Sequence, residues 1–167
     1  MRGWHRIPLA LAALAWMATP ALGQVNMTME APGLDGVREG IEVISVQWGV
    51  SNPGAGALTG SRGASVASFS TIELRKGVDA ASPQLFLRAA NGQILREVTL
   101  RFVDVRTGSE WQVIRLQNAR VASVRQSAEG QGLTEVIELS FEEITMTVTF
   151  GRGQWEATWN VAQGRGG

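Results

Sequence analysis

The stretch REVTLRFVDVRTGSEWQVIRLQ, residues 96–117, decides the fold class of this chain. Its apolar residues Val98, Leu100 and Phe102 alternate with polar ones, and this period of two is that of a half-buried β-strand. Residues 107–109 are a turn signal, and apolar residues return behind it. The stretch therefore predicts an antiparallel hairpin in a β-rich protein.

Strand patterns continue on the C-terminal side of this hairpin. Residues 119–127 predict a further strand, and residues 133–150 alternate for so long that two strands, or one strongly bent strand, are expected. After a tight glycine turn, residues 154–161 predict the closing strand. One face of that strand collects four apolar residues: Trp155, Ala157, Trp159 and Val161. Residues 163–167, rich in Gly and Arg, are expected to fray.

A further strand and a long loop lie on the N-terminal side. Residues 42–50, EVISVQWGV, predict a strand that places four apolar residues on one face: Ile44, Val46, Trp48 and Val50. Residues 51–65, SNPGAGALTGSRGAS, hold four glycines and one proline and predict a long loop. Loops of this length without regular structure are usually functional or disordered.

One segment, at about residues 80–90, breaks the period of two and predicts a single helix. Asp79 or Ser82 would cap its first turn, where Pro83 is tolerated, and Gly92 is a helix stop. The expected apolar stripe consists of Leu85, Phe86 and Ala89 or Ala90.

The order of strands, one helix and more strands predicts a mainly β fold, a β-barrel-like domain of two antiparallel sheets with a single α-helix. We expect one such domain over residues 24–167, which is long enough to bury a core. The apolar faces assign four aromatic residues to that core: Trp48, Phe86, Phe102 and Trp159.

The N-terminus has the three parts of a secretory signal peptide. Its basic start is formed by Arg2, His5 and Arg6. Residues 7–18 are uncharged and mainly apolar, and small residues then lead to a predicted cleavage site between Gly23 and Gln24. The apolar run is shorter than the roughly 20 residues that a membrane-spanning helix needs.

Removal of residues 1–23 would give a periplasmic or extracellular protein without an integral membrane segment. The alternative is a true start at Met27 or Met29, which would keep the protein in the cytoplasm before any secretion.

Charge gives no sign of a nucleic-acid partner. The chain has 15 basic and 15 acidic residues, two of the basic ones lie in the leader, and no polybasic run occurs.

The residue inventory argues against an enzyme and against a metal or cofactor. No Cys is present, and the one His, His5, lies in the leader, so the rest of the chain lacks imidazole and thiolate ligands for Zn²⁺ and a His base for a nucleophile. Lys76 is the sole lysine, and no Ser-x-x-Lys pattern lies near it. Four acidic residues follow predicted strands without calcium-loop spacing: Glu135, Glu138, Glu142 and Glu143. We expect no catalytic, cofactor-binding or metal-ligating residues.

An ordered set of segments resembles the haemolysin co-regulated protein (Hcp) family, the tube protein of bacterial type VI secretion systems. The segments are IEVISVQWGVSNPG (41–54), FSTIELRKGVDAASPQLFLRAANGQ (69–93), EWQVIRLQNARVASVRQS (110–127), LTEVIELSFEEI (133–144) and TWNV (158–161). Any one of them alone would mean little, but their order and spacing over most of residues 41–161 are specific.

The resemblance implies a non-enzymatic β-barrel-like domain that assembles into hexameric rings, which stack into a hollow tube. Its partner would be itself, and beyond that other secretion-system proteins or cargo. In the family the long loop after the Trp strand reaches toward the neighbouring ring. Here this implies an assembly loop that includes Ser51, Asn52, Pro53, Gly54, Gly56, Leu58 and Arg62.

Three features depart from the family pattern and leave a second function open. Residues 27–40 are shorter than the family segment, and the last hairpin, residues 149–156, is tighter. Family tube proteins form in the cytoplasm, whereas the leader implies general export. Two hypotheses therefore remain: a tube protein with a leader, and an exported binding or structural module that does not form a tube.

Overall fold

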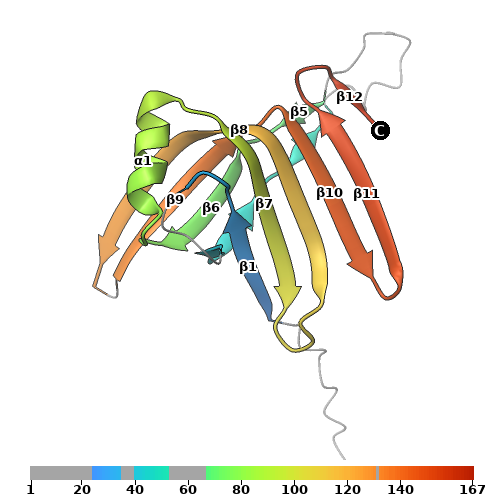
Figure 1. The fold of residues 1–167 in the computed structure, drawn as a ribbon, viewed down its shortest axis with the longest axis horizontal. Coiled ribbons are helices and arrows are strands. Elements are labelled where there is room, and N and C mark those ends of the chain that lie inside the picture. Colours follow the sequence, from blue (N-terminus) through green and yellow to red (C-terminus); the bar gives the residue numbers. More distant parts are fainter. Residues whose placement is uncertain (1–23, 35–39, 53–66, 131) are drawn as a thin grey trace, which may run out of the picture.

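The computed structural model describes residues 24–34, 40–52, 67–130 and 132–167, and the structural statements below concern these residues. They form one helix and a set of antiparallel strands (Figure 1). The elements are β1 Val25–Glu30, β2 Ile41–Val43, β3 Ser45–Gln47, β4 Val50–Ser51, β5 Ser68–Phe69, β6 Ile72–Gly77, α1 Ser82–Asn91, β7 Leu95–Asp104, β8 Glu110–Glu129, β9 Gly132–Ser140, β10 Glu143–Phe150, β11 Gly153–Asn160 and β12 Arg165–Gly166.

The hairpin predicted from residues 96–117 is confirmed as β7 and β8. Its turn is held by Asp104, whose carboxylate accepts hydrogen bonds from the backbone N–H groups of Arg106 (2.7 Å) and Thr107 (2.9 Å). These hydrogen bonds, led by that from Thr107, lower the pKa of Asp104 below its ordinary value. The turn therefore keeps an ionised carboxylate as the acceptor for its own backbone.

Strand β8 belongs to two walls of the fold. It pairs with β10 up to Gln117 and with β7 up to Ala119, and from Arg120 onward it pairs with β9. The change falls at Asn118, the one non-glycine residue with positive φ (51°) among the described residues. The two strands predicted at 110–117 and 119–127 are thus one bent strand. The long alternation at 133–150 splits into β9 and β10 beside the same corner.

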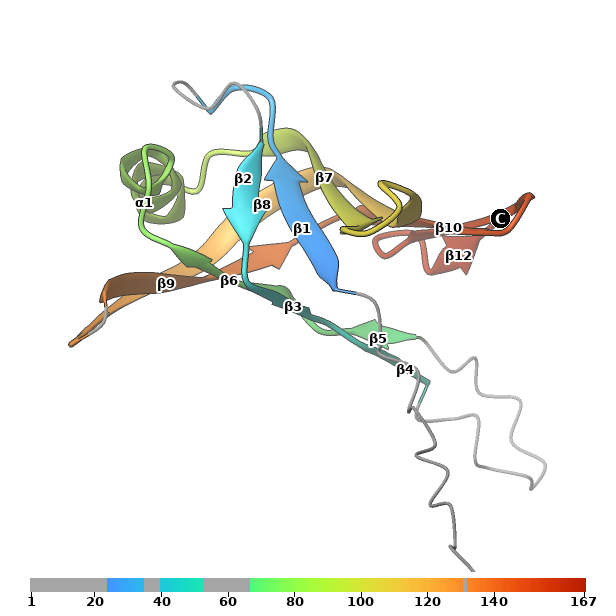
Figure 2. The ribbon, with the colours of Figure 1, turned by 90° about the horizontal axis from the view of Figure 1, so that it is seen from below.

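A second corner at Ile44 closes the barrel. β2 pairs with β1, and β3 pairs with β6, so the chain passes from one wall to the other across this residue (Figure 2). The prediction of one continuous face through Ile44 and Val50 is wrong, because the corner turns Ile44 outward (54% exposed) and puts Ile41 and Val43 in the core. The closed barrel runs β8–β7–β1–β2/β3–β6–β9 and back to β8.

The core fills this barrel. Its completely buried aliphatic and Met side chains are Met29, Ile72, Leu74, Leu85, Val98, Ile114, Leu116, Ile137 and Leu139. Trp48, Phe102 and Trp159 are partly buried and pack against this cluster. The expectation that Phe86 is a core residue is wrong, since its side chain is 60% exposed. Residues 85–87 are consecutive apolar residues on a helix, so only one of them, Leu85, faces the barrel.

The predicted helix is confirmed as α1. Pro83 lies in its first turn, and Gly92 ends it in the left-handed conformation (φ 68°). No side chain caps its first residue; instead Asp79 Oδ1 accepts a hydrogen bond from the N–H of Ala81, and Ser82 Oγ accepts one from the N–H of Asp79. The loop before the helix is therefore ordered by these two polar residues.

Strands β10, β11 and β12, which we call the wing, extend one wall beyond the barrel (Figure 1). The C-terminal tail expected to fray forms β12 instead. It pairs with β11 through Trp159 and Gly166, and Thr158 and Gly167 exchange two backbone hydrogen bonds of 3.1 Å. Backbone pairing with β11 therefore orders the tail.

Candidate assembly surface

The two faces of the β10–β11 hairpin differ sharply in polarity. Residues directly opposite each other on adjacent strands point to the same face. One face carries the apolar pairs Ile144–Trp159, Met146–Ala157 and Val148–Trp155. The other face carries the polar pairs Glu143–Asn160, Thr145–Thr158 and Thr147–Glu156.

The apolar face of the wing continues the lining of the barrel core. Ile144 lies opposite Leu116 of β8, which is completely buried. The exposed fraction then rises along the hairpin, from 4% at Ile144 to 36% at Val148 and 81% at Phe150. Trp155, opposite Val148, is 61% exposed. Within the described residues, an apolar sheet face therefore runs out of the core into solvent with no cover.

An apolar groove of about 210 Å³ lies where the wing leaves the barrel. Its wing side is formed by Ile144, Met146, Ala157 and Trp159. Its other side is formed by Trp48, Val50 and Phe69, which lie in and beside the short β4–β5 pair. The Phe69 and Trp159 rings are 6.2 Å apart, so the groove has aromatic walls. We call this the Trp48–Trp159 groove.

Two glycines make room for the wing's tryptophans. A Cβ atom added at Gly166 would lie 2.7 Å from Cε3 of Trp159, and one added at Gly153 would overlap the ring of Trp155. Both indoles therefore occupy space that a side chain at the glycine position would fill. This contact fixes the Trp159 side of the groove.

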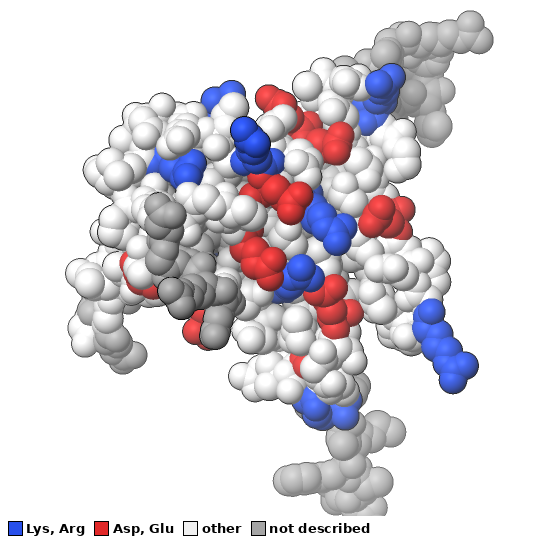
Figure 3. Space-filling model, in the orientation of Figure 1, with Lys and Arg blue, Asp and Glu red and all other residues white. Residues whose placement is uncertain are grey.

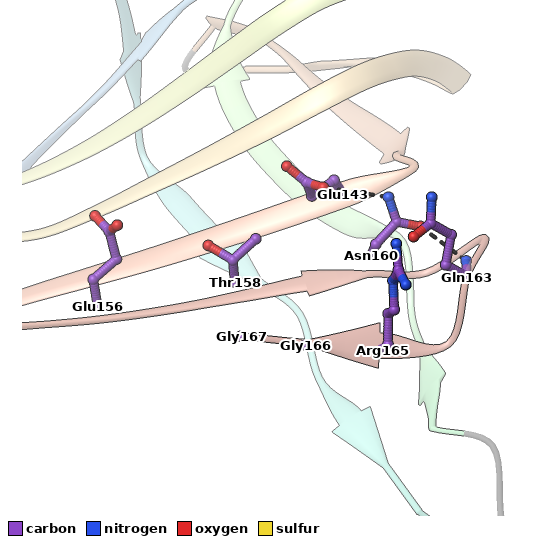
Figure 4. A pocket seen from close by; sticks show the side chains of 8 residues that line it. All are labelled: Glu143, Glu156, Thr158, Asn160, Gln163, Arg165, Gly166 and Gly167. Carbon is purple, nitrogen blue, oxygen red and sulfur yellow. Dashed lines mark hydrogen bonds between the residues drawn. The ribbon is translucent and has the colours of Figure 1, made fainter.

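The polar face of the wing contains a hollow of about 680 Å³ (Figure 4). Its polar groups largely satisfy one another: Asn160 donates to Glu143 (3.2 Å), and Thr147 donates to Glu156 (2.8 Å). The backbone N–H of Gln163 donates to Asn160 at 2.8 Å. In the described parts of the chain, no group of three His, Cys, Asp or Glu side chains is placed to hold a metal ion.

Charges of both signs alternate across the face of the molecule seen in Figure 3. On the outer surface of the barrel, Arg101 donates to Glu110 at 2.7 Å and to Glu30 at 2.9 Å. These hydrogen bonds, first that of Glu110, raise the pKa of Arg101 above its ordinary value. This surface is polar and internally paired, in contrast to the apolar face of the wing.

The sole lysine forms a buried ion pair instead of an accessible amine. Lys76 and Glu135 are both without exposed area, and the Lys76 Nζ donates to Glu135 Oε1 at 2.8 Å. Ser82 and Gln126 also donate to this carboxylate, at 2.8 and 2.9 Å. Burial opposes ionisation of Glu135, but the hydrogen bonds from Lys76, Gln126 and Ser82 outweigh it, so its pKa is lowered. The pair ties the start of α1, at Ser82, to β6 and β9.

The residues predicted for assembly and cleavage are only partly described. Ser51 belongs to β4 and pairs with Ser68, and Asn52 follows it at the surface. The remaining loop residues, Pro53, Gly54, Gly56, Leu58 and Arg62, lie outside the described residues, as does Gly23. The carbonyl of Gln24 accepts a hydrogen bond from the N–H of Val105 (2.9 Å). The described residues include no helix long and apolar enough to cross a membrane.

Sequence reasoning missed the wing tip as a functional feature. The alternation of Val148 and Phe150 predicts a strand, and the one signal of a functional tip is that the apolar face reaches the turn at Gly151 without a polar residue. Which side of the hairpin is left uncovered depends on the pairing of β10 with β8, which the sequence does not specify.

A family model and several solved structures match this chain over most of its length. The family model described as "Type VI secretion system effector, Hcp" matches residues 33–148. Among solved structures, Hcp1 from Salmonella typhimurium is 20% identical, with a TM-score of 0.73 over 85% of this chain and 98% of that one. A structure described as a type six secretion system protein is 17% identical, with a TM-score of 0.76 over 86% and 100%. The secreted protein Hcp3 from Pseudomonas aeruginosa is 15% identical, with a TM-score of 0.58 over 81% and 97%. No curated protein sequence matches the chain.

Proposed function

The chain belongs to the Hcp family of type VI secretion proteins, and from this premise we propose that it assembles with copies of itself into hexameric rings that stack into a tube. Membership also makes it a structural protein of the secretion system and not an enzyme. The observation that carries the proposal is the uncovered apolar face of the wing, on which Val148, Phe150 and Trp155 are exposed. Removal of such a face from water favours association with roughly 25 cal/mol per Å² of apolar area.

Further support comes from what the chain lacks. It has no Cys, so disulfides cannot staple the domain. Association can add stability in their place, because a partner that binds only the folded state shifts the folding equilibrium toward it. Self-association would thus cover the wing and stabilise the fold together.

The loop at residues 51–65 is proposed as the contact between stacked rings. β4 and β5 hold its two ends beside the Trp48–Trp159 groove, at the edge of the barrel. Deletion of Gly54 to Arg62 should leave single rings intact and reduce stacking, as seen by electron microscopy. Tubes of normal length from the deletion variant would contradict this role.

Residues 1–23 are proposed as an export leader. This proposal rests on the sequence pattern alone, and it favours a second candidate function, an exported module that does not form tubes. N-terminal sequencing of the native protein, with its compartment recorded, separates these cases. A native N-terminus at Gln24 outside the cytoplasm supports export, and one at Met27 or Met29 contradicts it.

Native mass spectrometry combined with light scattering tests the assembly itself. We expect a hexamer mass from the purified protein, in its full-length form and in the form that begins at Gln24. Electron microscopy of the same samples should then reveal rings and stacked tubes. A strict monomer at high concentration in both forms would contradict ring assembly.

A further inference from the structure

The tip of the wing presents an isolated apolar side chain. Phe150 is 81% exposed, the highest value among the exposed large apolar residues of the described chain. It precedes a two-residue turn, in which Gly151 has the positive φ (61°) that such tight hairpins require. The strand pairing on both sides of the turn fixes the direction of this side chain. Phe150 is therefore a preformed knob on a rigid hairpin.

The Trp48–Trp159 groove is a hole of suitable size and chemistry. Its walls are apolar and aromatic, and its volume is about 210 Å³. An apolar cavity of about 150 Å³ is enough to bind benzene. The groove thus has room for one phenyl ring.

The knob cannot reach the hole of its own chain. The groove residue nearest to Phe150 along β10 is Met146, four residues before it, and a strand rises roughly 3.4 Å per residue, so the two are about 14 Å apart. Both lie on the same face of a straight hairpin, and the pairing of β10 with β11 holds them apart. Phe150 can therefore fill only the groove of a second copy.

Charge beside the two features is complementary. Arg152, in the turn after Phe150, is exposed and forms no ion pair among the described residues. On the other side, Trp48 also borders a polar hollow of about 320 Å³ that contains Glu73. The nearest cation to Glu73 is Arg125, at 3.6 Å, and Arg125 lies closer to Glu138, at 2.7 Å. Glu73 is 43% exposed and its ion pair with Arg125 is long, so its carboxylate can accept a second cation.

We infer that Phe150 of one copy inserts into the Trp48–Trp159 groove of the next copy, with Arg152 beside Glu73. This inference rests on the proposed self-assembly and names the contact through which it occurs. The knob and the hole are different surfaces, so the contact is heterologous: each copy offers a knob to one neighbour and a hole to the other. Such head-to-tail contacts close into rings when the rotation between copies permits it.

A mixing experiment on the full chain tests the contact. Phe150→Asp removes the knob, and Ala157→Trp fills the hole from an exposed position on its wall. Each variant alone should associate at least about 30-fold more weakly than the wild type, the factor expected when a hot-spot aromatic is lost. Phe86→Asp is the matched control, because Phe86 is exposed to a similar degree but lies on α1, and it should leave assembly unchanged.

The 1:1 mixture of the two variants gives the decisive result. Phe150→Asp copies keep their holes and Ala157→Trp copies keep their knobs, so native mass spectrometry should find heterodimers and nothing larger. Unchanged melting temperatures of both variants establish that they fold. A mixture that stays monomeric overturns the inference. Assembly of either variant as strong as that of the wild type also overturns it. That result would mean that the groove is filled by the chain's own residues 53–66 or by nothing. Those results leave the proposed rings standing, whereas a wild-type protein that never associates overturns both.

Discussion

The barrel and the wing are built from the same alternation of apolar and polar residues, but they differ in what covers the apolar face. In the barrel, Ile114 and Leu116 of β8 are completely buried because the opposite wall closes over them. In the wing, Val148 and Trp155 lie on the same sheet face and stay exposed, because among the described residues the opposite wall reaches only as far as β4 and β5. The comparison shows that the alternation of apolar and polar residues determines which face of a sheet is apolar. Whether a single chain can bury that face depends on whether the opposite wall of the barrel covers it.

The largest expected effect lies in the barrel. Lys76→Met should destabilise the protein by about 3–5 kcal/mol, because it leaves Glu135 buried without its counter-ion. Chemical denaturation measures this loss. The double variant Lys76→Met with Glu135→Leu should recover much of it, since the carboxylate is then gone as well; failure to recover would indicate that Ser82 and Gln126 need the carboxylate as an acceptor.

The same pair predicts a dependence on pH. The pKa of Glu135 is lower in the folded protein than in the unfolded chain, so its contribution is present above the unfolded value of about 4.3 and is lost as the pH falls through the folded pKa. Unfolding free energy of the wild type should therefore fall below about pH 4. Glu135→Gln should reduce stability at neutral pH and show a shallower fall in acid; parallel curves would count against the ion pair.

The next effect compares truncations to alanine in the two regions. Leu116→Ala, at a fully buried site, should cost about 2–5 kcal/mol of unfolding free energy, and Val148→Ala should change it by less than about 0.5 kcal/mol in the monomer. Val148→Ala should instead weaken association. Similar losses of monomer stability at both sites would erase the distinction between barrel and wing.

Several features of the fold could be predicted from sequence and others could not. The β7–β8 hairpin follows from strict alternation around a turn, and α1 follows from Pro83 and Gly92. The sequence does not predict the corners at Ile44 and Asn118, because a change of partner strand leaves little trace in a local pattern. The sequence wrongly places Phe86 in the core, because three consecutive apolar residues do not reveal which one faces inward. The exposure of Phe150 depends on where the opposite wall ends, which is a property of the closed barrel.

A smaller effect concerns the glycine beneath Trp159. Gly166→Val should force the indole away from its position and cost about 1–3 kcal/mol through overpacking, with a measurable shift in Trp fluorescence. Gly130→Ala is the control, because a Cβ atom there would meet nothing within 4 Å. If the two variants have the same melting temperature, the close contact between β12 and Trp159 is not needed for stability.

The smallest effect is expected on the polar surface of the barrel. Arg101→Ala removes two ion pairs whose partners are 36–47% exposed, so we expect a loss of about 0.2–1 kcal/mol that shrinks in high salt. Thermal melts at low and high ionic strength measure this loss. A larger, salt-independent loss would mean that the outer surface contributes to stability as the core does.

The most direct test of the central claim is hydroxyl-radical footprinting of Trp155 and Phe86 as a function of protein concentration. In the single chain the two side chains are almost equally exposed, at 61% and 60%, but Trp155 lies on the wing and Phe86 on α1. If copies of the chain cover the wing, oxidation of Trp155 falls as the concentration rises, while oxidation of Phe86 stays constant. Equal oxidation of Trp155 at all concentrations, in a sample that has assembled, would contradict the account.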